Sequence, residues 1–280
     1  MVEITLGEIL LEIKNISVVK EKVSGEKITI LRNVNESIYN IIGHGQVVGI
    51  LGPSGVGKTT LFNAISGMEK PTEGSVLVNC DGAESNMQPV QRGHVGVVAQ
   101  NYPLLSHRTV LSNLIVAAKM KNGSSKKDIK ERAMAMLEDF ELADKAGCYP
   151  IQLSGGQRQR IAIAQQLLCS EHYLLMDEPF SGLDPIAKHN VRSLVTRVAE
   201  MNEKNTIIVT SHDIDSAVCV SDTLWLMGRD RDEKGNIIPG AYVKKIYNLA
   251  QMGLAWHQDV ELMPEFAEMV RELKLKFKEL

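Results

Sequence analysis

The 280-residue sequence lacks several features that would place it in a specialised class. Its four cysteines form no CxxC or Cys/His pair, so neither a disulfide framework nor a zinc site is expected, and free thiols in a reducing compartment fit better. No apolar run approaches the ~18–20 residues that a membrane-spanning helix needs. The first residues lack the basic and then apolar segments of a secretory signal. We therefore predict a cytoplasmic protein.

No charge of one sign dominates either. The chain holds 31 Lys+Arg against 34 Asp+Glu, a net charge of −3, which disfavours a dedicated nucleic-acid binder. The 44% apolar and 23% charged fractions are those of globular proteins and exclude disordered and collagen-like classes. The length allows one large domain or two modest ones, and no internal repeat or long linker divides it.

Apolar strand segments alternate with amphipathic helical segments along most of the chain. Two Ile/Val/Leu-rich segments at 10–19 and 28–38, joined by a polar turn, predict paired N-terminal strands. A helical pattern at 109–166 then interrupts the alternation, which otherwise predicts an α/β protein with a mainly parallel sheet. Further strands are expected at 46–51, 75–78, 95–98, 173–176 and 206–210, a hairpin at 224–227 and 241–246, and helices at 58–68, from 185, and at 264–280.

A glycine-rich segment follows the strand predicted at 46–51. It reads Gly-Pro-Ser-Gly-Val-Gly-Lys-Thr and fits the pattern G-x-x-x-x-G-K-[ST] between a strand and a helix. Glycines let successive backbone N–H groups turn toward an anion, and the helix N-terminus adds its positive dipole end. Lys58 is expected to reach the β- and γ-phosphates of a nucleotide, and Thr59 to offer its hydroxyl to Mg²⁺. The predicted nucleotide-binding residues here are Gly52, Pro53, Ser54, Gly55, Val56, Gly57, Lys58, Thr59 and Thr60.

Two acidic residues end the apolar strand predicted at 173–176. Asp177 is placed to hold Mg²⁺, directly or through water, beside the nucleotide. Glu178 lies one residue further, where it is expected to polarise the water that attacks the γ-phosphate. Together with the glycine-rich loop, these carboxylates predict a P-loop nucleotide hydrolase or kinase.

A second serine- and glycine-rich turn opens another predicted helix. Residues 153–157 read Leu-Ser-Gly-Gly-Gln, and Ser154 suits a helix N-cap. A capped helix alone does not explain a second anion cradle in one chain. With this motif the chain resembles the ATP-binding subunit of an ABC transporter, whose signature motif is LSGGQ. The resemblance covers residues 10 to about 227, and implies that a second subunit's ATP is contacted by Ser154, Gly155, Gly156 and Gln157.

The resemblance assigns further residues in the order in which the family carries them. Gln100 matches a glutamine that contacts Mg²⁺ or the attacking water, and Asp184 belongs to a Ser-Gly-Leu-Asp loop that runs across the dimer interface. His212 matches a histidine that contacts the γ-phosphate. ATP and Mg²⁺ are the implied cofactors. The implied catalytic residues are Glu178, His212 and Gln100, and the implied Mg²⁺ ligands are Thr59, Gln100 and Asp177.

The resemblance also implies the ABC ATPase fold. In this α/β fold, a P-loop core with a mainly parallel sheet carries an N-terminal antiparallel β subdomain and an inserted α-helical subdomain. The ATPase domain is expected at 1–250 with the insertion at about 101–166, followed by a C-terminal extension at 251–280 whose amphipathic helix either covers the core or docks a partner. The family usually stacks an aromatic residue on adenine, but the segment 16–25 has none. Val18 or Val19 is expected to contact the base instead, which leaves the preference for ATP over GTP open.

The implied function is transport driven by ATP hydrolysis. Two such subunits are expected to pair head to tail on two ATP·Mg and to drive integral membrane permease subunits on the inner face of the cell membrane. A substrate-binding protein is a candidate further partner, and no nucleic acid is expected. Tyr102, Leu104 and Leu105 resemble the coupling region of importers for nitrate, sulfonates or polar amino acids, or else pack the insertion. The alternatives are an ATPase of a lipid-trafficking or efflux system, and a non-transport ABC ATPase in translation or DNA maintenance.

Overall fold

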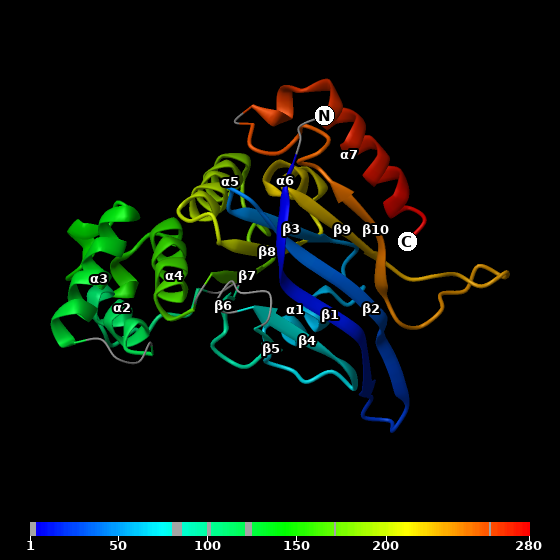
Figure 1. Cartoon of the computed structure of the whole chain (residues 1–280), viewed down its shortest axis with the longest axis horizontal. Helices are drawn as coiled ribbons and strands as arrows, with labels where there is room; N and C mark the ends of the chain where they lie inside the picture. Colours follow the sequence, from blue (N-terminus) through cyan, green and yellow to red (C-terminus); the bar gives the residue numbers. More distant parts are fainter. Residues whose placement is uncertain (1–3, 80–85, 100–101, 121–124, 171, 258) are drawn as a thin grey trace.

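The computed structural model describes residues 4–79, 86–99, 102–120, 125–170, 172–257 and 259–280. Its first sheet is antiparallel where its strands pair, with the order β2-β1-β4-β5 (Figure 1). The two long N-terminal strands were predicted by their Ile/Val/Leu-rich segments, whereas the three-residue β5 was not. The strands of this sheet are β1 (Leu6–Glu21), β2 (Lys27–Ile41), β4 (Glu73–Asn79) and β5 (Met87–Pro89).

The second sheet is mainly parallel, with the order β10-β9-β3-β8-β7-β6. Only β10 runs antiparallel to its neighbour β9, as the predicted hairpin requires. The mixed α/β fold expected from the sequence is thereby confirmed. The strands of this sheet are β3 (Gln46–Leu51), β6 (Val95–Val98), β7 (Tyr173–Asp177), β8 (Thr206–Ser211), β9 (Thr223–Gly228) and β10 (Tyr242–Asn248).

The helices cover this sheet and also form an arm beside it. Figure 1 shows α2 and α3 standing away from the strands, with α4 between them and the sheet. The predicted helix at 58–68 ends at Ile65, because Gly67 takes a left-handed φ of 70°. The α-helices are α1 (Lys58–Ile65), α2 (Val110–Ala118), α3 (Lys126–Asp139), α4 (Gly155–Cys169), α5 (Pro185–Glu200), α6 (Ile214–Val220) and α7 (Pro264–Phe277), and the short 3-10 turns are Ala143–Lys145, Pro150–Gln152 and Val260–Leu262.

The hydrophobic core lies on both faces of the parallel sheet. Side chains alternate between the faces of a strand, so Ile208 packs with the antiparallel sheet and α1, whereas Ile207 packs with α4, α5 and the arm. Burial on both faces explains why these strands read as continuous apolar runs. A third cluster lies between α6, α7 and β9, and the buried face of α7 contributes Phe266, Met269, Val270 and Leu273.

Within the described parts of the chain, no helix is both long enough and apolar enough to cross a membrane.

Candidate functional site

The glycine-rich loop lies between the end of β3 and the start of α1. Gly55 and Gly57 have φ values of 74° and 125°, a region in which glycine is favoured over residues with a Cβ. No side chain caps α1, so the first backbone N–H groups of this helix are left for an anion. A Cβ at Gly55 would meet no atom within 4 Å, and Gly55 is exposed, so a ligand can approach the backbone of the loop here. Val56 differs from its neighbours because its side chain is buried in the core and leaves only its backbone to the loop.

The amine of Lys58 lies across the mouth of this loop. Its Nζ donates to the carbonyl oxygens of Gly52 at 2.9 Å and Pro53 at 3.3 Å. It also forms an ion pair with Glu178 Oε1 at 3.2 Å, although the Lys58 side chain is only 6% exposed. The loop thus carries a desolvated cation that an anionic ligand can contact.

The acidic residues predicted after β7 lie at the same edge of the sheet as the loop. Strand β8 separates β3 from β7, and Thr210 near its end contacts both acidic residues: its Oγ1 donates to Asp177 Oδ1 at 2.5 Å. The backbone N–H of Glu178 donates to the Thr210 carbonyl at 3.1 Å. These bonds hold Glu178 at a φ of 50°, an uncommon conformation for a residue with a Cβ.

Glu178 is the centre of the cluster, since its carboxylate contacts two other predicted residues. Oε1 pairs with Lys58, and Oε2 accepts hydrogen bonds from His212 Nδ1 at 2.8 Å and from the His212 backbone N–H at 3.3 Å. His212 is 46% exposed and Glu178 is 20% exposed, so a solvent molecule or ligand can reach both. The structure therefore brings together a cation, a carboxylate and an imidazole from three separate segments.

The oxygen atoms expected to hold Mg²⁺ fit this ion in kind and number. Asp177 supplies a carboxylate, and Thr59 lies exposed in the first turn of α1. Mg²⁺ is typically bound by one or two protein side chains together with phosphate oxygens and waters. Within the described ranges, no group of three or more His, Cys, Asp or Glu residues could hold a metal ion by itself. Gln100, the third predicted ligand, lies outside the described residues.

The Leu-Ser-Gly-Gly-Gln segment forms a separate site at the start of α4. Ser154 accepts a hydrogen bond from the Gln157 N–H at 3.2 Å, and the Gln157 side chain accepts one from Ser154 N at 2.9 Å. Ser154, Gly155 and Gly156 are exposed, and open space adjoins both glycines. Between this turn and the glycine-rich loop, the described residues form no hydrogen bond or ion pair. Asp184 likewise caps its own helix, accepting from the N–H groups of Ile186 and Ala187.

One expectation for the surroundings needs correction. Val18 is buried in the core at 2% exposure and cannot contact a base, whereas Val19 is exposed. Of the three predicted coupling residues, Leu105 is exposed, whereas Tyr102 and Leu104 are half-buried and pack against the hydrophobic core. The coupling role of these three residues stays a prediction.

Sequence reasoning missed two residues that contact the site. Thr210 was predicted only as the end of the strand at 206–210, although a polar residue near the end of a buried strand is a usable signal. Arg229, which follows β9, donates from Nη2 to the carbonyl oxygens of Gly55 at 2.6 Å and Val56 at 3.3 Å. A contact across 174 positions leaves no local signal in the sequence.

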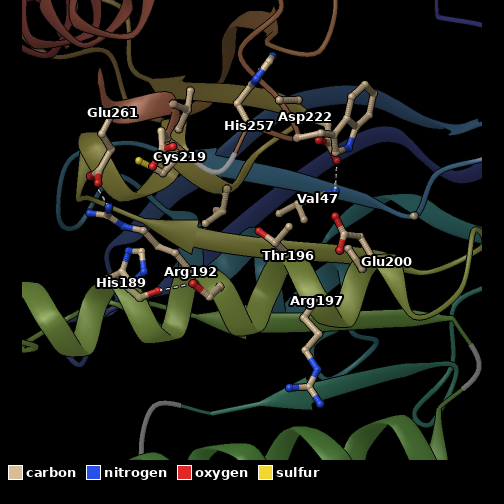
Figure 2. Close-up of a pocket in the computed structure, with 18 residues that line it drawn as sticks. Val47, His189, Arg192, Thr196, Arg197, Glu200, Cys219, Asp222, His257 and Glu261 are labelled. Atoms are coloured by element: carbon tan, nitrogen blue, oxygen red, sulfur yellow. Dashed lines mark hydrogen bonds and ion pairs between the residues drawn. The ribbon is translucent and has the colours of Figure 1, made fainter. Parts of the chain in front are cut away.

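A large cavity of about 510 Å³ lies elsewhere (Figure 2). Gly45 and Val47 line it, so it adjoins the beginning of β3, whereas the glycine-rich loop follows the end of this strand. Burial raises the pKa of Asp222 to about 7 and that of Cys219 to about 12 in its wall. None of the predicted site residues lines this cavity.

Comparisons with known proteins identify the family of the chain. A family model described as ABC transporter matches residues 31–181. The sulfate/thiosulfate import ATP-binding protein CysA of Gloeobacter violaceus is 36% identical over 239 residues, covering 83% of this chain and 67% of that protein. The L-cystine transport system ATP-binding protein TcyN of Escherichia coli is 40% identical over 195 residues, covering 67% of this chain and 77% of that protein. The chain spans only 54–67% of the length of three CysA relatives.

Solved structures are similar over most of the chain. The ATP-binding cassette MJ0796, in a dimeric post-hydrolysis state bound to ADP and Pi, has a TM-score of 0.65 at 30% identity and covers 86% of this chain and 99% of its own. The cbiO1 protein of Clostridium perfringens, part of the complex cbiONQ, has a TM-score of 0.68 and covers 96% and 100%, but at 24% identity it supports the fold alone. This chain belongs to the ABC transporter family, and its fold is that of the family's ATPase domain, the ATP-binding cassette.

Proposed function

We propose that the chain hydrolyses ATP as a head-to-tail dimer and thereby drives a separate membrane permease. The observation that carries this proposal is the separation of two anion cradles on one chain. Among the described residues, no hydrogen bond or ion pair joins the loop beside Lys58 to the turn at Ser154, yet Gly55 in the loop and Gly155 and Gly156 in the turn are all exposed. A second copy placed head to tail would bring each turn to the other copy's loop. The dimeric form of the similar cassette MJ0796, bound to ADP and Pi, supports this arrangement.

In the proposed site, Lys58 and the backbone of the glycine-rich loop bind the β- and γ-phosphates of ATP. Lys58 now contacts Glu178, so nucleotide binding exchanges this carboxylate for a phosphate oxygen. The exchange leaves the Glu178 carboxylate available to water at the moment when a substrate is present. Thr59 and Asp177 would hold Mg²⁺, with Gln100 as a further proposed ligand. When bound, Mg²⁺ neutralises charge that develops on the phosphate oxygens.

Glu178 is proposed to accept a proton from the attacking water as general base. His212 holds the Glu178 carboxylate through two hydrogen bonds and, being half exposed, contacts the γ-phosphate. Ser154 and the backbone N–H groups of Gly155 and Gly156 donate hydrogen bonds to the same phosphate from the second subunit. Gln157 holds Ser154 through the two capping hydrogen bonds, and Asp184 lies across the interface. Hydrolysis increases the negative charge between the subunits and separates them.

Exposed apolar side chains beside the helical arm support a permease partner. Leu105, Tyr149 and Ile151 are 38%, 45% and 88% exposed. They belong to one region, because Leu105 N–H donates to Asn113 of α2 and Val110 N–H, at the start of α2, donates to the Cys148 carbonyl. The printed names of the relatives describe import ATP-binding proteins, and cbiO1 is described as part of a transporter complex. We therefore propose an importer whose cassette lies on the cytoplasmic face of the membrane, with a substrate-binding protein as a further partner.

The test uses a tagged Glu178→Gln variant, which is expected to bind ATP without hydrolysing it. Detergent-solubilised host membranes are incubated with this variant and ATP, and stoichiometric partners are identified by mass spectrometry. We expect an integral membrane protein with several spans, and a strongly reduced recovery with Lys58→Ala, which lacks the phosphate-binding amine. Recovery of ribosomes, DNA or soluble proteins alone would contradict the transport function.

A further inference from the structure

The loop between β9 and β10 has no part in the proposed function so far. It comprises residues 229–241 and projects from the body of the molecule in Figure 1. Its first residue, Arg229, nevertheless contacts the glycine-rich loop: Nη2 donates to Gly55 O at 2.6 Å and to Val56 O at 3.3 Å. Arg229 is half-buried in this position.

These two carbonyl groups determine where loop N–H groups point. The peptide bond is planar and trans, so a carbonyl held on one side directs the N–H of the next residue to the other side. The Val56 N–H is used within the loop, where it donates to Pro53 O at 3.3 Å. The peptide between Val56 and Gly57 therefore directs the Gly57 N–H, and Arg229 binds the carbonyl of that peptide.

Two cations share the carbonyl groups of the loop. Lys58 Nζ binds the oxygens of Gly52 and Pro53, and Arg229 binds those of Gly55 and Val56. The second half of the loop contains Gly55 and Gly57, both left-handed, and glycine loses more backbone freedom on ordering than any other residue. A hydrogen bond from outside the loop therefore reduces the cost of ordering the backbone most in this half.

The position of Arg229 is fixed by the contacts of the next residue, Asp230. Asp230 forms an ion pair with Arg32 of β2 at 2.8 Å and one with Lys244 of β10 at 3.4 Å, and it accepts a hydrogen bond from Tyr242 at 2.8 Å. The hydrogen bond from Tyr242 and the cations beside it lower the pKa of Asp230, so this carboxyl is ionised at neutral pH.

Backbone bonds fasten the other end of the loop to β2. Arg32 N–H donates to Ala241 O at 3.0 Å, and Ala241 N–H donates to Ile30 O at 2.9 Å. The base of the loop is therefore attached to both sheets.

We infer that Arg229 is a positioning residue for phosphate binding, which holds the glycine-rich loop in its anion-binding conformation before the nucleotide arrives. The inference rests on the proposed function, because it assumes that this loop binds the phosphates of a nucleotide. Preorganisation of this kind raises affinity by reducing the ordering cost of binding. It acts on substrate and transition state alike, so it changes KM more than kcat.

The experiment compares Arg229→Ala with Arg231→Ala in the full chain. Arg231 is the matched control, since it lies in the same loop and its guanidinium donates only to Gly235 O within that loop. With ADP as the probe, we expect Arg229→Ala to raise Kd about tenfold and KM for ATP by a similar factor, with kcat within about twofold. Backbone amide exchange at Gly57 should become faster in the same variant. Arg231→Ala should match the wild type in all four measurements.

Three results would overturn the inference: an unchanged Kd in Arg229→Ala, an equal loss in both variants, or a loss confined to kcat. An equal loss of ADP affinity in both variants would mean that the removed positive charge, and not the contact with the glycine-rich loop, weakens binding. If Arg229→Ala does not fold, Arg229→Lys keeps the charge and one donor, and an intermediate Kd is expected from it, whereas a wild-type Kd would refute the hydrogen-bonding argument. Failure of the wild-type chain to bind ADP would instead contradict the proposed function.

Discussion

Replacing Glu178 with glutamine separates the two functions that its position gives this residue. The change keeps the size of the side chain and removes its charge. In the structure the carboxylate pairs with Lys58 at 3.2 Å and accepts from His212 Nδ1 at 2.8 Å. Lys58 would keep its hydrogen bonds to the carbonyls of Gly52 and Pro53. The fold should therefore tolerate the substitution.

The substitution should slow hydrolysis but strengthen ATP binding. A positioned general base contributes about 10²–10⁴-fold to a rate, so the barrier should rise by about 2.7–5.4 kcal/mol. Binding should improve, because the phosphate no longer displaces a carboxylate from Lys58. An ion pair with a partly exposed partner is worth up to about 1 kcal/mol, which corresponds to about fivefold tighter binding.

The assay measures phosphate release at saturating ATP together with the Kd for ATP. Glu203→Gln, an exposed glutamate that precedes β8 and so lies at the opposite end of this strand from Thr210, serves as the control and should change neither quantity. Light scattering with ATP present should detect a stable dimer of Glu178→Gln. An ATPase rate within tenfold of the wild type would refute Glu178 as the base, and weaker ATP binding would refute the competition for Lys58.

Three further predictions test other parts of the molecule. A mixture of Lys58→Ala and Ser154→Arg chains, each inactive alone, should recover about a quarter of the wild-type ATPase rate, because half of the dimers then hold one intact site of two. No recovery would contradict head-to-tail sharing. Burial raises the pKa of Asp222 to about 7, so the folded state binds the extra proton and the free energy of unfolding should fall by up to about 1.4 kcal/mol per unit as pH rises from 4 to 7; urea titrations at pH 5 and 7 should show a smaller fall in Asp222→Asn. Leu273→Ala should lower the free energy of unfolding by about 2–5 kcal/mol, and Leu275→Ala, 53% exposed on the same helix, by less than about 0.5 kcal/mol.

The parts of the fold predicted well are those whose signals are local. The strand at 95–98 and strands β3, β7 and β8 were located from short runs of apolar residues in the sequence. The glycine-rich loop was located from residue spacing alone. Strand order was not accessible in this way. The insertion of β8 between β3 and β7, which brings Thr210 to Asp177, depends on long-range pairing that no sequence window contains.

The sequence also did not predict which face of a strand each side chain occupies. Val18 and Val19 are equivalent in composition, but successive residues of a strand face opposite sides, and the bulges in β1 obscure which side is buried. The same limit hid Arg229, since its contact with Gly55 depends on how the end of β9 faces a loop 174 residues earlier. Sequence spacing thus brought Lys58, Glu178 and His212 into one predicted site, while packing determined which neighbours they contact.

The distance between Lys58 and Glu178 also limits the side-chain lengths that the site can use. Lys58 begins α1 after the glycine-rich loop, and Glu178 directly follows β7, so the two residues come from segments 120 positions apart. Their charged atoms meet at 3.2 Å. An aspartate at 178 would be shorter by one carbon–carbon bond, about 1.5 Å, and the separation would exceed the roughly 4 Å limit of an ion pair. This ion pair therefore needs an acid of glutamate length at position 178.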